Sequence, residues 1–161
     1  MSHIESQLQR LGLKLPAPIV LPPHIKLPFP WVRIAGSKAY ISGHGPLNLD
    51  GSIAGPLGKV GKDLLLEEGY QAARLTALAM LASLKVALGD LDRVECWLRV
   101  FGMVNTDSSF NSYPLVINGF SDLIVEVYGD ERGSHARSAI GVAGLPFNLP
   151  VEIEAEVLIR P

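Results

Sequence analysis

The chain has 161 residues, the length of one ordinary domain, and a net charge of −2 at neutral pH. This charge offers no general attraction to nucleic acid or to an anionic membrane, and the longest apolar run, residues 75–84, is shorter than the about 20 residues that span a bilayer. Hydrophobic residues make up 48% and charged residues only 19%, against about 25% charged in a typical soluble domain. We therefore expect one domain over residues 1–161 that hides apolar surface in a homo-oligomer.

The first thirty residues, 1–30, predict a short helix and then a proline-rich arm. Ser2 can cap a helix that carries Ile4, Leu8 and Leu11 on one face. Six prolines up to Pro30 exclude a helix or a central strand, so the arm should run extended over the surface or onto a neighbouring subunit. The helix is too polar to be the apolar segment of a signal peptide, and we expect a cytoplasmic protein.

A hairpin and a loop follow the arm. Strands are predicted at 32–35 and 39–42, with a turn at Gly36-Ser37-Lys38 between them. A glycine-rich segment from Gly43 to Gly61 then predicts a loop.

A long helix is predicted to begin at Asp63, as its N-cap, and to end at Leu88, with Gly89 closing it. Its apolar residues recur at intervals of three and four positions, which defines one buried face. Six alanines raise its helix propensity and keep its surface flat, which suits packing against a sheet.

Alternating apolar residues predict a strand from Arg93 to Val104. Its core face is expected to hold Val94, Cys96, Leu98 and Val100, and its other face Trp97 and Phe101 among charged residues. Cys96 is the single cysteine, and its place in the strand indicates a buried small hydrophobe rather than a nucleophile. The mixed aromatic and charged face is typical of a subunit interface.

A second helix is predicted from Ser112 to Tyr128, with Pro114 in its first turn and Gly129 as its cap. A polar loop and two strands, at 136–143 and 151–159, complete the chain. The order β-β-α-β-α-β-β predicts an α+β fold with both helices packed on one face of a mixed sheet. The chain has nothing left to cover the other face, which is a second reason to expect an oligomer.

Arg137 lies beside small residues on the first of these two strands. Alternation puts Arg137, Ala139, Gly141 and Ala143 on one face. Small neighbours leave space next to the guanidinium, whose planar fork binds both oxygens of a carboxylate. A carboxylate-binding pocket and an interface salt bridge to a closely packed subunit fit this pattern equally well.

Three glutamates share one face of the last strand. Glu152, Glu154 and Glu156 alternate with apolar residues and are spaced by about 6.7 Å. Such a row is typical of a solvated face; under a partner subunit, however, burial and mutual repulsion would raise the pKa of at least one carboxyl and make it a candidate general base. Because the two strands are consecutive, we expect Arg137 and Glu152 to be neighbours across a hairpin.

The remaining candidates are less specific. Ser42-Gly43-His44-Gly45 puts a hydroxyl and backbone N–H groups at a strand end, which fits either a small-anion site or a tight turn. The four histidines lack the spacing of a metal site and are expected at the surface: His3, His24, His44 and His135. The sequence contains no glycine-rich nucleotide-binding motif, no Gly-x-Ser-x-Gly motif of hydrolases and no run of basic residues.

Several of these segments resemble the RidA/YjgF family, also called L-PSP endoribonucleases. At the C-terminus they are Ala136-Arg137-Ser138, Val142, Leu145-Pro146 and Val151-Glu152-Ile153-Glu154-Ala155. Ile41-Ser42-Gly43 and Val116-Ile117-Asn118 are similar to two further family motifs. The resemblance covers most of residues 28–159, and the long second helix is similar to that of the YjgF/chorismate mutase-like branch.

The resemblance implies a chorismate mutase-like fold and a homotrimer with its sheets facing inward and three clefts between subunits. RidA-type members hydrolyse reactive 2-imino acids, or their enamine tautomers, to 2-oxo acids and ammonia without a metal or organic cofactor. By position, Arg137 would hold the substrate carboxylate and Glu152 would activate the attacking water. Ser42, Gly43 and Asn118 would line the cleft.

Two positions depart from the family pattern. Phe29 stands where RidA-type members usually have a tyrosine, and Ala139 stands where many have a cysteine; both are expected to line the substrate site. The substrate, or catalysis itself, can therefore differ. Two alternatives stay open: a non-catalytic trimer that binds small carboxylate metabolites, and an endoribonuclease, which the charge of −2 and the lack of a basic aromatic patch disfavour.

Overall fold

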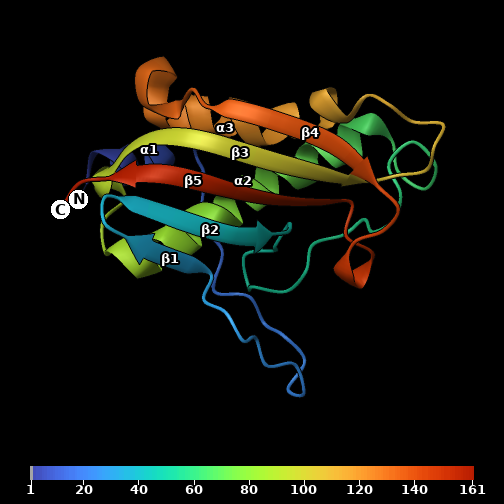
Figure 1. The fold of residues 1–161 in the computed structure, drawn as a ribbon, viewed down its shortest axis with the longest axis horizontal. Coiled ribbons are helices and arrows are strands. Elements are labelled where there is room, and N and C mark those ends of the chain that lie inside the picture. The colour runs from blue at the N-terminus through green and yellow to red at the C-terminus, as the bar shows by residue number, and fades with distance from the viewer. Residues whose placement is uncertain (1) are drawn as a thin grey trace.

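One layer of the structure is a mixed five-stranded sheet in the order β1-β2-β5-β3-β4, and the helices lie behind it (Figure 1). The computed structural model describes residues 2–161. The helices are α1 (His3–Arg10), α2 (Leu66–Leu88) and α3 (Tyr113–Gly133), with short 3-10 turns η1 (Leu91–Arg93) and η2 (Pro146–Asn148). The strands are β1 (Val32–Ala35), β2 (Lys38–His44), β3 (Val94–Asn105), β4 (Ala136–Val142) and β5 (Val151–Ile159). The predicted α+β architecture is confirmed.

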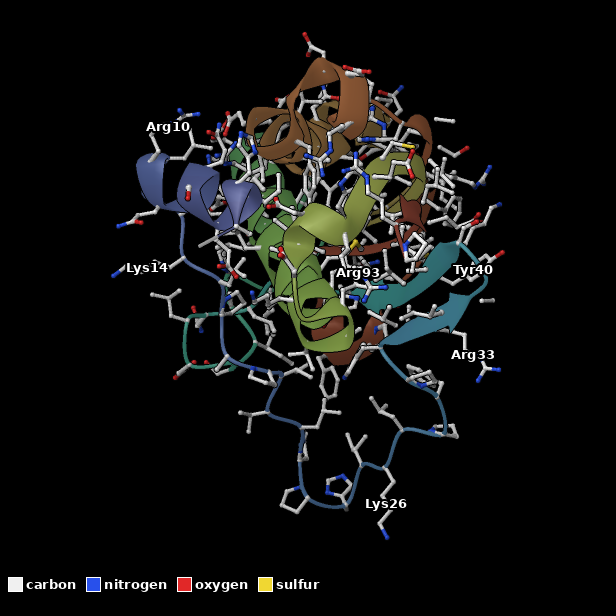
Figure 2. All side chains as sticks on the ribbon, turned by 90° about the vertical axis from the view of Figure 1, so that its left-hand side faces the viewer. Arg10, Lys14, Lys26, Arg33, Tyr40 and Arg93 are labelled. Atoms are coloured by element: carbon white, nitrogen blue, oxygen red, sulfur yellow. The ribbon has the colours of Figure 1, made fainter. Side chains whose placement is uncertain are left out.

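The N-terminal helix and the hairpin form as predicted, except that Leu11 lies just past the helix and is exposed, and β2 extends to His44, into the predicted loop. The Ser2 hydroxyl accepts a hydrogen bond from the Glu5 N–H, and α1 buries Ile4 and Leu8. The proline-rich arm then loops away from the body of the molecule, with Lys26 near its far end (Figure 2). It returns at β1, which pairs with β2 through a two-residue turn that begins at Gly36, with φ 60°.

The last strand does not pair with the strand before it. β5 lies antiparallel between β2 and β3, whereas β4 lies parallel to β3 at the edge of the sheet. A parallel pair needs a long crossover, which α3 supplies between β3 and β4. The apolar face of β5 is buried along its whole length, which favours the centre of the sheet. The expected hairpin is therefore wrong, and Arg137 and Glu152 are not neighbours.

The predicted alternation of β3 is wrong at its start, because two bulges interrupt the pairing with β5. The register shifts between Val94 and Cys96 and again between Trp97 and Arg99. Each bulge inserts an extra residue and reverses the side-chain alternation. Trp97 thus points into the core, where its ring contacts Phe120 and Tyr128 edge-on, and Cys96 is only half-buried. The second bulge restores the predicted phase, so Val100 is buried.

The ends of the two long helices differ from the prediction. Asp63 is not the N-cap of α2, because its carboxylate accepts a hydrogen bond from the Lys59 N–H in the preceding turn. The helix begins at Leu66, and Gly89, with φ 78°, ends it as expected. Gly129, with φ 75°, breaks α3 as expected, but a further helical turn replaces the predicted loop. The Arg132 guanidinium, within that turn, donates to backbone carbonyls at the start of β3.

Helices α2 and α3 pack closely on the same face of the sheet. Gly119 of α3 lies against the backbone of α2, where an added Cβ would be 2.0 Å from the Tyr70 carbonyl oxygen. By length and composition alone α2 is apolar enough to cross a membrane, but 56% of its most apolar 18-residue window is buried inside the structure. Its apolar character is that of a core helix.

Replacing Gly119 with alanine should destabilise the protein, because the two helix backbones must separate to admit the methyl group. Overpacking of this kind costs about 1–3 kcal/mol of the free energy of unfolding. Gly144→Ala is the matched control, since nothing lies within 4 Å of its added Cβ. Urea denaturation measures both variants, and equal stability of the two would contradict the close helix contact.

Candidate functional site

Arg137 is held at the edge of the sheet by three neutral acceptors on α3. Its Nη1 donates to Asn118 Oδ1 at 2.9 Å and to Ser121 Oγ at 3.0 Å, and its Nη2 donates to the Pro114 carbonyl at 3.3 Å. Three of its five N–H groups are thereby used. The Nε–H and one Nη2–H have no partner among residues 2–161, so two donors remain available to an anion.

His135 fixes the direction of the Ser121 hydroxyl. Its Nδ1 lies 2.7 Å from the Gly133 carbonyl, which only accepts, so Nδ1 carries the proton. Burial lowers the pKa of His135, and the neutral ring therefore leaves Nε2 as an acceptor, 2.9 Å from Ser121 Oγ. Ser121 donates to His135 and accepts from Arg137. The sequence predicted a surface histidine here; the structure half-buries it in this chain of hydrogen bonds.

Within the part of the chain that the structure describes, Arg137 forms no salt bridge. The residue is half-buried, and burial lowers the pKa of its guanidinium while the charge of Asp122 partly offsets this effect. A cation held by neutral groups, with two N–H donors free, is an anion-binding arrangement. The alternative of an interface salt bridge concerns a second copy and stays open.

The small residues beside Arg137 make room for α3 rather than for a ligand. Arg137, Ala139 and Gly141 share one face, as predicted, and this face meets the helices opposite buried residues of β3; Ala143 lies beyond the strand. Ala139 packs against the core, and an added Cβ on Gly141 would lie 2.5 Å from the Tyr113 ring. Ala139 therefore contributes no free space next to the guanidinium in one protomer.

Glu152 forms the second group of predicted site residues, together with Gly43. An added Cβ on Gly43 would lie 2.1 Å from Glu152 Oε1, so only glycine leaves room for the carboxylate. Glu152 is half-buried on the sheet face that no helix covers, and burial, with the charge of Glu154 second, raises the pKa of Glu152. The raised carboxyl pKa that was predicted under a partner subunit is thus present at Glu152 within one protomer.

Phe29 and Ser42 lie on the same side as Glu152. The Ser42 hydroxyl donates to the Pro30 carbonyl at 2.9 Å, which ties the end of the arm to β2. Phe29 is 47% exposed and meets Trp31 edge-on, with ring centroids 6.0 Å apart. Together with Arg99, both residues line a hollow of about 380 Å³ on the open face of the sheet.

The predicted site residues therefore form two groups that do not meet within one protomer. We call them the Arg137 group, with Asn118 and Ser121, and the Glu152 group, with Gly43. Arg137 faces the helices opposite Val100, whereas Glu152 lies on the open face opposite Met103. β3 separates their strands, so they are offset by about 10 Å across the sheet and about 10 Å along it.

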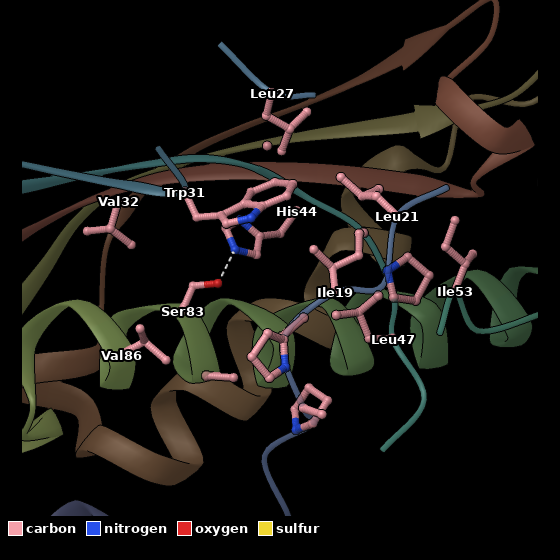
Figure 3. A pocket seen from close by; sticks show the side chains of 18 of the residues that line it. Ile19, Leu21, Leu27, Trp31, Val32, His44, Leu47, Ile53, Ser83 and Val86 are labelled. Atoms are coloured by element: carbon pink, nitrogen blue, oxygen red, sulfur yellow. Dashed lines mark hydrogen bonds between the residues drawn. The ribbon is translucent and has the colours of Figure 1, made fainter. Parts of the chain in front are cut away.

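Next to the Glu152 group lies a feature that the sequence interpretation missed. His44, expected at the surface, is only 5% exposed. A bulge between Ile41 and His44 turns its ring inward, where the Trp31 ring lies against it with centroids 5.0 Å apart (Figure 3). Gly43 within a strand is a sequence signal for such a bulge. Between the arm and α2, the ring lines an apolar cavity of about 600 Å³ that Glu152 and Gly43 also border.

His44 is a neutral, fully bonded residue. Its Nδ1 donates to the Ser42 carbonyl at 2.6 Å, and its Nε2 accepts from the Ser83 hydroxyl at 2.8 Å (Figure 3). Burial lowers its pKa to about 4, against a smaller opposite effect of the Ser42 carbonyl. Among residues 2–161, no group of three or more His, Cys, Asp or Glu side chains is arranged to hold a metal ion.

Comparison with known proteins covers nearly the whole chain. The family model described as "YjgF/chorismate mutase-like, putative endoribonuclease" matches residues 5–153. Protein TCP17 of Trypanosoma cruzi is 40% identical over 155 residues, which is 96% of this chain and 93% of that protein.

Solved structures agree with the fold. Protein Atu1372 of Agrobacterium tumefaciens is 39% identical with a TM-score of 0.84, and the match covers 97% of this chain and 91% of that one. TdcF of E. coli, solved with bound serine, is 21% identical with a TM-score of 0.57 over 90% of this chain and 94% of that one. The expected chorismate mutase-like fold is confirmed.

The pH dependence of stability should report on His44. Because its folded pKa of about 4 lies below the ordinary 6.5, only the unfolded chain binds this proton between those values. The contribution of His44 to the free energy of unfolding is full above pH 6.5 and falls by up to about 3 kcal/mol as the pH approaches 4. His44→Gln cannot titrate, so its urea-denaturation stability should decline less steeply from pH 7 to 4.5. Parallel curves would refute the buried neutral histidine.

Proposed function

This chain belongs to the RidA/YjgF family, and from that premise we propose that it hydrolyses reactive 2-imino acids, or their enamine tautomers, to 2-oxo acids and ammonia. The Arg137 guanidinium is the observation that carries this function. It is fixed by Asn118 and Ser121 and keeps two free N–H donors for the substrate carboxylate. E. coli TdcF, which shares the fold, has bound serine, a small carboxylate.

Glu152 is the proposed base for the attacking water. Its raised pKa makes the carboxylate a stronger proton acceptor near neutral pH. The water oxygen bonds to C2 of the imine while Glu152 takes a water proton, and the nitrogen is protonated as the C=N double bond becomes single. Glu152 then gives its proton to the amino nitrogen as the C–N bond breaks and ammonia leaves, and the remaining hydroxyl loses its proton to become the 2-oxo group. An enamine first takes a proton at its β-carbon.

We further propose that the active site forms between copies of the chain in a homotrimer. The Arg137 and Glu152 groups lie on opposite faces of one sheet, so a neighbouring copy must supply the missing half. The open face also supports assembly, because it exposes Tyr40 and Ile140, each about two-fifths accessible, with no helix over them. Covering this face would bury Glu152 further and strengthen its basicity.

Two other functions are less well supported. Hydrolysis of RNA would bring phosphates to a face that carries Glu152, Glu154 and Glu156, which repel them. A non-catalytic binding protein would need Arg137 but not the raised pKa of Glu152. Ligand binding without ammonia release therefore separates that class from the proposed hydrolase.

Loss of either group should abolish the proposed activity. Arg137→Ala and Glu152→Gln are each expected to lower kcat/KM for freshly generated 2-iminobutanoate at least about a hundredfold, measured as 2-oxobutanoate release above the spontaneous rate. Glu131→Gln, exposed near the end of α3 and outside both hollows, is the matched control and should retain wild-type activity. Unchanged activity in Arg137→Ala would show that Arg137 does not bind the substrate carboxylate.

Mixing the two inactive variants tests the shared site. When Arg137→Ala and Glu152→Gln chains are unfolded, mixed equally and refolded together, about a quarter of the clefts should contain both intact groups, because these come from different copies. Activity should return in the mixture and not in either variant refolded alone. No recovery, or a solution mass of one 17.3 kDa chain by light scattering, would contradict a site built between copies.

The pH profile should report on Glu152 and its neighbour. Activity falls at low pH as the base is protonated, and the raised pKa places this acid limb above the ordinary value for glutamate. Glu154→Gln removes a charge that raises the pKa of Glu152, so its acid limb should move to lower pH. Glu156→Gln should leave the limb in place. Identical profiles for wild type and Glu154→Gln would argue against Glu152 as the titrating base.

A further inference from the structure

The cavity of about 600 Å³ is lined by several separate parts of the chain. The proline-rich arm supplies Ile19, Leu21 and Leu27, the end of β1–β2 supplies Trp31 and His44, and α2 supplies Val86 (Figure 3). Its size lies in the range of sites that bind small molecules, and its lining is almost entirely apolar. None of the residues with an assigned role requires a cavity of this kind.

The arm that forms its outer wall is bonded to the rest of the fold. The Ala17 N–H donates to the Leu49 carbonyl and the Val20 N–H to the Gly51 carbonyl, both at 2.9 Å. Gly51 adopts φ 85°, and an added Cβ there would lie 2.2 Å from the Pro18 carbonyl oxygen. Fixed proline-rich backbone on one side and a helix on the other make this a pre-formed site.

No free positive charge is available inside the cavity. His44 is neutral, and its polar atoms are bonded to Ser42 and Ser83. Lys85, the single lysine or arginine among the lining residues, is paired with Glu5 of α1. A carboxylate would lose its hydration here without gaining a cation, so the chemistry of the cavity favours an uncharged apolar group.

The cavity opens directly onto the proposed catalytic carboxylate. Glu152 and Gly43, which contact each other, are among its lining residues, as is Phe147. An imine carbon placed at Glu152, with its carboxylate on Arg137 of the neighbouring copy, leaves the substrate side chain as the group next to the cavity. The side chain of the proposed substrate is therefore a specific candidate to occupy the cavity.

We infer that the cavity receives the substrate side chain and that the protein selects 2-imino acids with bulky apolar side chains, branched aliphatic or aromatic. This selectivity rests on the proposed function. The cavity wall from the arm is the structural element that sets it, since the arm provides the largest group of apolar lining residues. A free apolar ligand unrelated to the reaction is the competing occupant.

Binding of the stable 2-oxo acid products tests the inference without requiring turnover. By calorimetry, 4-methyl-2-oxopentanoate and phenylpyruvate should bind wild type at least about tenfold more tightly than 2-oxobutanoate, through added apolar burial. Trp31, in the cavity wall, should change its fluorescence with the large ligands. In turnover, kcat/KM for the corresponding imino acids should follow the same order.

Two variants fill the cavity from α2. Ala82→Phe projects a ring into it, and Val86→Trp does so from a side chain that is 76% exposed and therefore replaceable without unfolding. Both should reduce the large-to-small preference to near unity. Gln71→Phe, exposed on the same helix and outside the cavity, is the control and should keep the preference.

The outcomes separate the two proposals. If no imino acid is turned over but the large 2-oxo acids still bind more tightly and lose that advantage in both variants, the hydrolase is refuted and the side-chain cavity stands. Equal affinity for large and small 2-oxo acids, or a preference that both variants retain, overturns the inference. So does equally tight binding of 4-methylpentan-2-one, which lacks the carboxylate, because the cavity would then hold an apolar ligand independently of the site.

Discussion

The insertion of β5 between β2 and β3 is the constraint on which the rest of the structure depends. A strand bonded on both edges presents one face to the helices and the other to the open side. Its apolar residues complete the core, and its three glutamates are forced onto the uncovered face. β4 is displaced to the sheet edge by the same arrangement, and Arg137 with it. One strand position thus separates the two charged groups that the proposed chemistry must bring together.

Both groups are prepared by neutral surroundings rather than by opposite charges. Arg137 is positioned by an amide, a hydroxyl and a carbonyl, and His135 orders that hydroxyl. Glu152 lies over a glycine that leaves room for its carboxylate, and burial raises its pKa. Because neither charge is cancelled within the protomer, each stays available for a ligand or for a second copy. This is the physical basis of the proposal that the site forms between subunits.

The local features that the sequence predicted correctly are those set by neighbouring residues. The cap at Ser2, the turn at Gly36 and the helix stop at Gly89 depend on short-range backbone geometry. The errors arose where distant segments interact. Bulges against β5, a strand more than fifty residues away, move Trp97 to the opposite face and bury His44, which was expected in a surface loop. Asp63 is not the expected cap because its carboxylate is bonded to the Lys59 N–H.

The sequence by itself determined the fold class, the apolar face of each helix and the chemical identity of the candidate groups, because periodicity and residue type are local properties. Only the tertiary structure decided that Arg137 and Glu152 lie on opposite faces, since strand order is set by long-range packing. It also decided that the prolines of the arm enclose a neutral apolar cavity beside Glu152. Extended backbone was predictable from those prolines; what it covers depends on where β2 and α2 come to lie.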